Sequence, residues 1–101
     1  MDIREEYALL SQELFSGTIG ADEKNAVLIK LADLFFVSLD TFEHDVTDGI
    51  ELCIVNEGTE KIIPYLENLK AGFLGKKAGF PNKDDFCVES IDFWIKKIRN
   101  P

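Results

Sequence analysis

Carboxylates are the side chains in this sequence whose number and spacing could carry chemistry. Between Asp33 and Glu60 there are eight of them and no lysine or arginine. Two carboxylates can serve as general acid and general base. Here they are too many and too evenly spread for any pair to stand out as catalytic. A surface this acidic is instead expected to meet a basic partner.

The single histidine, His44, lies among acidic residues and invites comparison with a calcium-binding loop. In that loop the sixth position is glycine and the twelfth is a carboxylate. Counted from His44, Gly49 is sixth but Val55 is twelfth, so the pattern fails. One histidine also rules out a two-histidine metal site. We therefore predict no metal ion and no cofactor.

Nucleophilic and phosphate chemistry also find little support. Cys53 and Cys87 lie in apolar stretches, which raises the pKa of a thiol and lowers its reactivity. We interpret them as two reduced core thiols of a cytoplasmic protein. The stretch from Gly72 to Gly79 has the residue types of a phosphate-binding loop at the wrong spacing. The chain is therefore predicted not to be an enzyme.

The charge is distributed unevenly along the chain. The first sixty residues hold fourteen acids and three bases, a net charge of −11, whereas the last forty-one hold five acids and eight bases, a net charge of +3. Nucleic-acid binders are usually basic overall, and this chain has a pI near 4.5. No apolar run approaches the roughly 20 residues that cross a bilayer. We predict neither direct nucleic-acid binding nor a membrane association.

Length and apolar periodicity predict a mainly α protein, a single-domain bundle of four to five helices over residues 1–101. The first helix carries the stripe Ile3, Tyr7, Leu10 and Leu14. The second is the most apolar and is expected at the centre. Asp45 or Thr47 is expected to cap the third. The helices are expected at about residues 3–14, 22–43, 46–57, 63–72 and 84–99, with a loop over 73–83.

Residues 50–63 leave an alternative open. Ile50 to Val55 is rich in residues that strands favour, and the four residues that follow suit a turn, so a short β-hairpin at 50–63 competes with helix. Pro64 would remove a backbone hydrogen bond from a helix that began at Glu60. A helix that starts near Ile63 keeps this proline in the first turn, where it is tolerated. We favour the helical interpretation.

The acidic run is the candidate binding surface, with a solvated, non-functional face as its alternative. Carboxylates near the end of the second helix would match lysines and arginines of a partner, which speeds association and fixes register. Phe42 and His44 are expected at the centre, as an apolar anchor and its neighbour. The predicted partner-binding residues are Asp33, Asp40, Phe42, Glu43, His44, Asp45, Asp48 and Glu51.

Three stretches carry a resemblance to a known class. They are Leu14–Ile19, Leu34–Phe35 and Phe42–Asp45. In these the chain resembles the immunity proteins of bacterial toxins, of the colicin D immunity type, which belong to bacteriocin and contact-dependent growth inhibition systems. The resemblance covers about the first 48 residues. It implies a helical inhibitor that occludes a basic toxin domain, a nuclease of the RNase type, with carboxylates in place of phosphates.

Two other functions remain open. One is an acidic decoy that mimics nucleic acid and inhibits a host defence protein. The other is a structural or regulatory helical subunit whose apolar stripes pack on a large partner. Binding that weakens strongly with salt favours either electrostatic hypothesis, whereas salt-independent binding favours the subunit.

Overall fold

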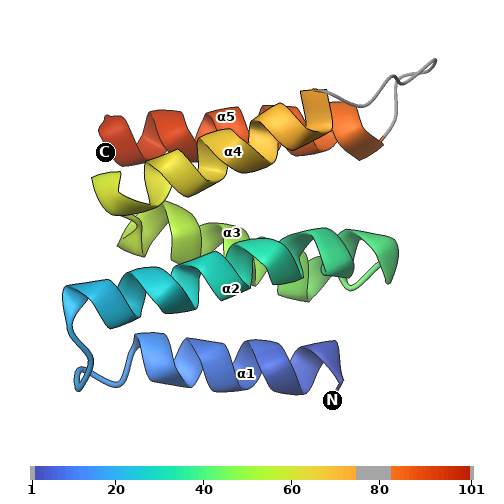
Figure 1. The fold of residues 1–101 in the computed structure, drawn as a ribbon. Helices are drawn as coiled ribbons and strands as arrows, with labels where there is room; N and C mark the ends of the chain where they lie inside the picture. Colours follow the sequence, from blue (N-terminus) through green and yellow to red (C-terminus); the bar gives the residue numbers. More distant parts are fainter. Residues whose placement is uncertain (1, 75–82, 101) are drawn as a thin grey trace. The chain divides into compact units, whose positions relative to one another are not determined.

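The computed structural model describes residues 2–74 and 83–100, and all regular structure within them is helical (Figure 1). This confirms the predicted mainly α class. The elements are α1 (Ile3–Leu14), α2 (Ala21–Asp40), α3 (His44–Glu57), the 3-10 helix η1 (Glu60–Ile62), α4 (Ile63–Leu74) and α5 (Lys83–Arg99).

The hairpin alternative at residues 50–63 is wrong, since this segment forms the rest of α3, η1 and the start of α4. Ile50, Cys53 and Ile54 are all buried, and their i, i+3, i+4 spacing places them on one helical face. The β-branched residues therefore serve burial rather than strand pairing. Gly58 is the C-cap of α3, which agrees with the predicted helix end near residue 57.

The start of α4 follows the predicted logic. Thr59 caps η1, because its hydroxyl oxygen accepts the Lys61 N–H at 3.3 Å. α4 then begins at Ile63, so Pro64 lies in the first turn. At that position a helix loses nothing from the missing N–H.

Three boundaries differ from the prediction. α2 ends at Asp40 rather than near residue 43, and α3 begins at His44 with Glu43 at the N-cap position, so neither Asp45 nor Thr47 caps it. α4 continues to Leu74, two residues past the predicted end at residue 72. Most of the predicted loop at 73–83 lies outside the described residues.

Backbone contacts divide the chain into two compact units, Met1–Gly58 and Thr59–Pro101. The first holds α1, α2 and α3, and the second holds η1, α4 and α5. The assignment of residues 1–101 to a single domain stays a prediction.

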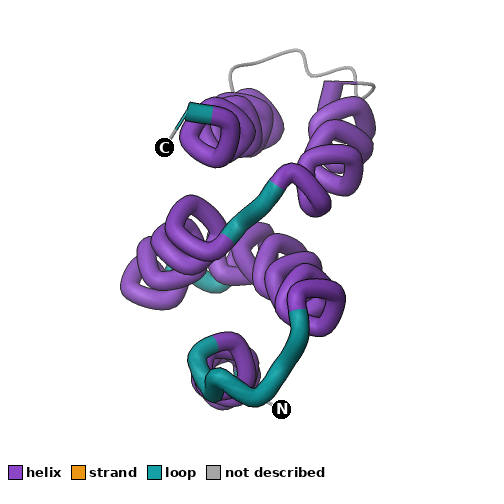
Figure 2. The backbone as a smooth tube through the Cα atoms, turned by 90° about the vertical axis from the view of Figure 1, so that its left-hand side faces the viewer, coloured by secondary structure: helices purple, strands orange, loops and turns teal. Residues whose placement is uncertain are grey.

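The first unit is a three-helix packing in which α2 runs antiparallel to α1 and α3 runs antiparallel to α2 (Figure 1). α1 contacts both of the others, and the end-on view shows it lying against the α2–α3 pair (Figure 2). Asp2 caps α1 by accepting the Arg4 N–H at 3.2 Å, and Glu5 and Glu6 occupy the first turn, where the helix dipole favours anions.

α2 supplies half of the buried apolar residues of this unit, more than either α1 or α3, in line with its strongly apolar sequence. Leu31 and Ala32 are completely buried and Phe35 is 1% exposed. Each such leucine or phenylalanine contributes about 1.5–3 kcal/mol through burial. The buried apolar residues of the unit are Leu10, Leu14, Val27, Leu28, Leu31, Ala32, Leu34, Phe35, Val46, Ile50, Cys53 and Ile54.

α1 and α3 approach closely where Tyr7 meets Gly49. A Cβ atom built on Gly49 would lie 2.8 Å from Cζ of Tyr7 and nearer still to its hydroxyl oxygen. Real Cβ atoms do not reach such separations. An added side chain would therefore force the tip of the phenol ring to move away from α3, whereas glycine itself weakens a helix interior by about 1 kcal/mol.

In the second unit, α4 and α5 form an antiparallel pair (Figure 1). Cys87, Ile91 and Trp94 of α5 are fully buried, and their i, i+4 and i+7 spacing places them on one face of the helix. Lys70 of α4 pairs with Asp92 of α5 at 2.6 Å. Half-exposed ion pairs of this kind contribute at most about 1 kcal/mol, so apolar burial dominates.

We predict that Gly49→Ala destabilises the protein by about 1–2 kcal/mol, because the strain of a forced side chain exceeds the gain in helix propensity. Chemical denaturation with circular dichroism measures this. The matched control is Gly72→Ala in α4, where an added Cβ meets nothing within 4 Å and the substitution should stabilise. In a Tyr7→Ala background Gly49→Ala should also stabilise. If it costs as much there as in the native chain, the tyrosine is not the cause.

Candidate binding surface at the α2–α3 corner

The chain reverses between α2 and α3 through Thr41, Phe42 and Glu43. Phe42 has φ of 58°, in the left-handed region. The Glu43 N–H donates to the Ser38 carbonyl oxygen at 3.0 Å, and the Phe42 N–H donates to the Leu39 carbonyl oxygen at 3.4 Å. These two bonds form a Schellman motif, which closes α2 and directs the chain into α3.

Phe42 is an unusual residue for this position. Glycine normally occupies it, because a left-handed backbone costs other L-residues about 1–2 kcal/mol. The side chain is also 77% exposed, so burial does not offset the strain. Its ring lies edge-on to His44, with centroids 6.4 Å apart. The corner therefore holds an aromatic ring in solvent at a cost in stability.

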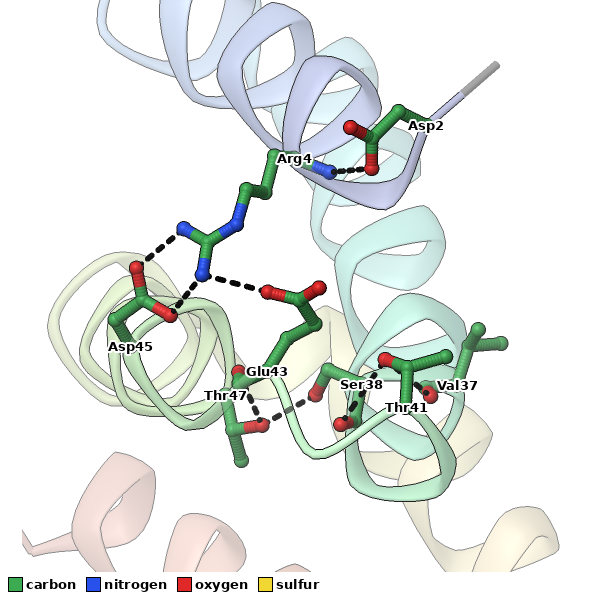
Figure 3. Close-up of polar contacts among 8 residues, drawn as sticks. All are labelled: Asp2, Arg4, Val37, Ser38, Thr41, Glu43, Asp45 and Thr47. Atoms are coloured by element: carbon green, nitrogen blue, oxygen red, sulfur yellow. Dashed lines mark hydrogen bonds and ion pairs between the residues drawn. The ribbon is translucent and has the colours of Figure 1, made fainter.

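A pair of buried hydroxyl groups links the two helices that flank the corner. The hydroxyl oxygens of Ser38 and Thr47 lie 2.5 Å apart (Figure 3). Ser38 is also 2.6 Å from the Phe35 carbonyl oxygen, and Thr47 is 3.1 Å from that of Glu43. Two hydroxyl protons serve at most two of these three bonds at once. The contact ties the last turn of α2 to the first turn of α3.

Arg4 reaches from α1 to the corner and holds two carboxylates (Figure 3). Its guanidinium forms a bidentate pair with Asp45, with Nη2 2.8 Å from Oδ1 and Nη1 bonded to Oδ2. Nη2 also lies 2.6 Å from Oε2 of Glu43. Bidentate pairing fixes the plane of both groups. One cation serves two anions, so this cluster keeps a net negative charge.

The pairing changes the titration of both partners. The hydrogen bond from Arg4 lowers the pKa of the Asp45 carboxyl below its ordinary value of 3.8, and the charge of the guanidinium adds to this. The same bond raises the pKa of Arg4. All three side chains remain reachable by solvent: 51% of Arg4 is exposed, 27% of Glu43 and 66% of Asp45.

The predicted binding residues divide into two groups. Four of them lie together at the corner: Phe42, Glu43, His44 and Asp45. Two exposed carboxylates adjoin these four: Asp40, the last residue of α2, and Asp48, in the first turns of α3. Glu51 is half-buried further along α3. Asp33 lies apart.

Asp33 lines a hollow between α1 and α2 with Glu6 and Lys30. Asp45, in contrast, contacts Arg4. Arg4 and Glu6 are two positions apart on α1, which separates their directions by about 200°. Asp33 of α2 and Asp45 of α3 therefore lie on opposite sides of α1, and the eight predicted residues do not form one flat face.

Two residues of this surface escaped the sequence analysis. Arg4 is 41 positions from Asp45, and no local pattern joins them. Leu52 is 61% exposed on α3. The exposure of Leu52 could have been predicted from the sequence. Leu52 falls outside the apolar stripe of its helix, so helical spacing places it on the side that carries the acidic residues.

The charge asymmetry follows the division into units. Residues 1–58 carry thirteen acids and three bases, a net charge of −10, whereas residues 59–101 carry a net charge of +2. Two of the three bases in the first unit form ion pairs: Arg4 with Glu43 and Asp45 at the corner, and Lys24 with Glu57 at 3.2 Å. The acidic surface is thus a property of the α1–α3 unit.

Other chemistries find no support in the described part of the chain. Its histidine, cysteine and carboxylate side chains form no group of three or more that could hold a metal ion. Cys53 and Cys87 are buried and not disulfide-bonded, as predicted. Burial, with a smaller contribution from Glu57, raises the pKa of the Cys53 thiol and makes it a poor nucleophile. No described helix is long and apolar enough to cross a membrane.

Comparisons with protein-family models, curated proteins and solved structures find no match to this chain.

We predict that Phe42→Gly stabilises the protein by about 0.5–1 kcal/mol, because relief of left-handed strain exceeds the entropy that glycine adds to the unfolded chain. Thermal and chemical denaturation measure the change. Thr41→Gly is the matched control, since its φ of −95° needs no glycine, and it should destabilise. A loss of stability in Phe42→Gly would mean that the exposed ring contributes to folding.

We predict that Arg4→Gln raises the pKa of the Asp45 carboxyl towards 3.8, as a carboxyl ¹³C titration by NMR would measure. A depressed folded-state pKa stabilises the native protein above the unfolded-state value, and that stability is lost as pH falls through the folded-state pKa. The native chain should therefore exceed Arg4→Gln in stability at pH 7 and lose this advantage in acid. An unchanged Asp45 titration would contradict the pairing.

Proposed function

We propose that this chain is an immunity protein that binds and neutralises a basic bacterial toxin. The part of the toxin that it binds is a nuclease domain. The observation that carries the proposal is Phe42, a solvent-exposed aromatic ring held in a strained backbone among carboxylates. Residues kept in costly conformations cluster at binding sites. A partner that buries this ring would recover the hydrophobic free energy that the free protein forgoes.

The surroundings of Phe42 suit such a role. Binding energy in protein interfaces concentrates in a few anchors, often aromatic, within a less important rim. Glu43 and Asp45 are already oriented by Arg4, so a partner's lysine or arginine would meet ordered carboxylates and less side-chain entropy would be lost on binding. The net charge of −10 on residues 1–58 would steer a cationic partner to this unit.

The same features favour a protein over nucleic acid or an anionic membrane, because both of these carry negative charge and would be repelled. A decoy that imitates nucleic acid would be displaced from a DNA-binding partner by added nucleic acid, so a competition measurement distinguishes it from an immunity protein. The nuclease identity of the target comes from the resemblance to immunity proteins, with carboxylates in place of phosphates.

We predict that replacing Asp45 and Asp48 by lysine slows association with the partner at least about tenfold, because rim charges mainly control the on-rate. The partner to test first is the terminal domain of the protein encoded directly upstream, with association measured by surface plasmon resonance and protection by growth of cells that express that domain. The control, with the same charge change, is Glu13→Lys with Glu23→Lys, exposed on the same unit. Equal effects of the two variants would reduce the role of the corner to net charge alone.

The apolar anchor has its own test. Phe42→Gly should bind the partner about 100-fold more weakly while the fold is more stable, because losing a central aromatic anchor costs about 2–4 kcal/mol. Affinity is measured by calorimetry beside the denaturation experiment described above. Binding that survives this substitution would exclude Phe42 as the anchor.

A further inference from the structure

A row of exposed side chains continues from the corner along α3. His44, Asp48 and Leu52 are spaced at i, i+4 and i+8, so they lie one above another on the helix. All three are exposed, and Leu52 is 61% exposed. His44 contacts the Phe42 ring. We call these three residues the α3 row. Asp48 places a carboxylate in the middle of the row. Leu52 is the apolar side chain at one end, and Phe42 lies beside His44 at the other.

The corresponding surface of α2 differs in charge. Lys30, Asp33 and Val37 follow one another at helical spacing, and all three line the hollow beside α1. Val37 is 48% exposed, so α2 also presents an apolar side chain to solvent. The lysine in this row would repel a cationic partner, whereas α3 contains no lysine or arginine.

We infer that the partner docks along α3 rather than α2, with Leu52 as a second apolar anchor after Phe42 and Asp48 between them. This inference rests on the proposed function and specifies its partner. The charge complementarity requires a cationic protein surface. The spacing requires that surface to hold two apolar pockets: His44, beside the first anchor, and Leu52 are eight residues apart, about 12 Å along the helix.

The test compares matched substitutions on the two helices of the full-length protein. Leu52→Ala and Val37→Ala each shorten an exposed aliphatic side chain, and Asp48→Lys and Asp33→Lys make the same charge change. The probe is a short amphipathic peptide of leucine and lysine residues, with an oligolysine peptide of equal charge as its control. Binding is followed by ¹⁵N–¹H chemical shifts and by calorimetry.

We expect the amphipathic peptide to shift the amide signals of α3 from His44 to Asn56. Leu52→Ala and Asp48→Lys should each weaken its binding about tenfold, while Val37→Ala and Asp33→Lys should change it less than about twofold. Oligolysine should bind more weakly and be indifferent to Leu52→Ala, because it has no apolar group for that side chain to contact.

The results distinguish failure of the docking direction from failure of the proposed function. If the shifts and losses centre on α2, the docking direction is wrong and the proposed function survives. If neither peptide binds the α1–α3 unit in low salt, both the docking inference and the proposed function are wrong. Equal small effects of all four variants would mean diffuse charge attraction and would also overturn the α3 row.

Discussion

The left-handed backbone at Phe42 is the constraint on which the rest of the first unit depends. It allows α2 to end and α3 to begin within three residues, so the two helices return past each other with Ser38 and Thr47 in contact. That short reversal also brings Glu43 and Asp45 within reach of Arg4 on α1. A longer or looser connection would leave the guanidinium and its two carboxylates unaligned. Local strain, helix packing and surface charge thus have one common origin.

Much of the fold could be predicted because it depends on local patterns. Apolar spacing located all five helices, and Pro64 marked the first turn of α4. The end of α2 could not be found in this way. Leu39 and Phe42 continue the helical spacing of apolar residues, and no residue that favours a left-handed turn interrupts it. A phenylalanine in a glycine position gives a sequence no sign of a helix end.

The candidate site was predictable only in part. The acidic run drew attention to the corner, and Phe42, Glu43, His44 and Asp45 do gather there. The sequence could not show that Asp33 lies on the other side of α1, because that depends on how three helices pack. The contact of Arg4 with Asp45 has the same origin: it joins residues 41 positions apart, and only tertiary structure creates it.

The placement of the cations decides where negative charge remains. Arg4 meets the start of α3, and Lys24 meets Glu57 at its end, where the helix dipole adds to the negative charge. Both ends of α3 are thus partly neutralised, and neither of these two bases pairs with Asp48, which lies between them. Since self-repulsion disfavours a compact unit with a net charge of −10, a bound cation near Asp48 would relieve repulsion that the unit's own bases leave. Binding and folding would then favour the same position on α3.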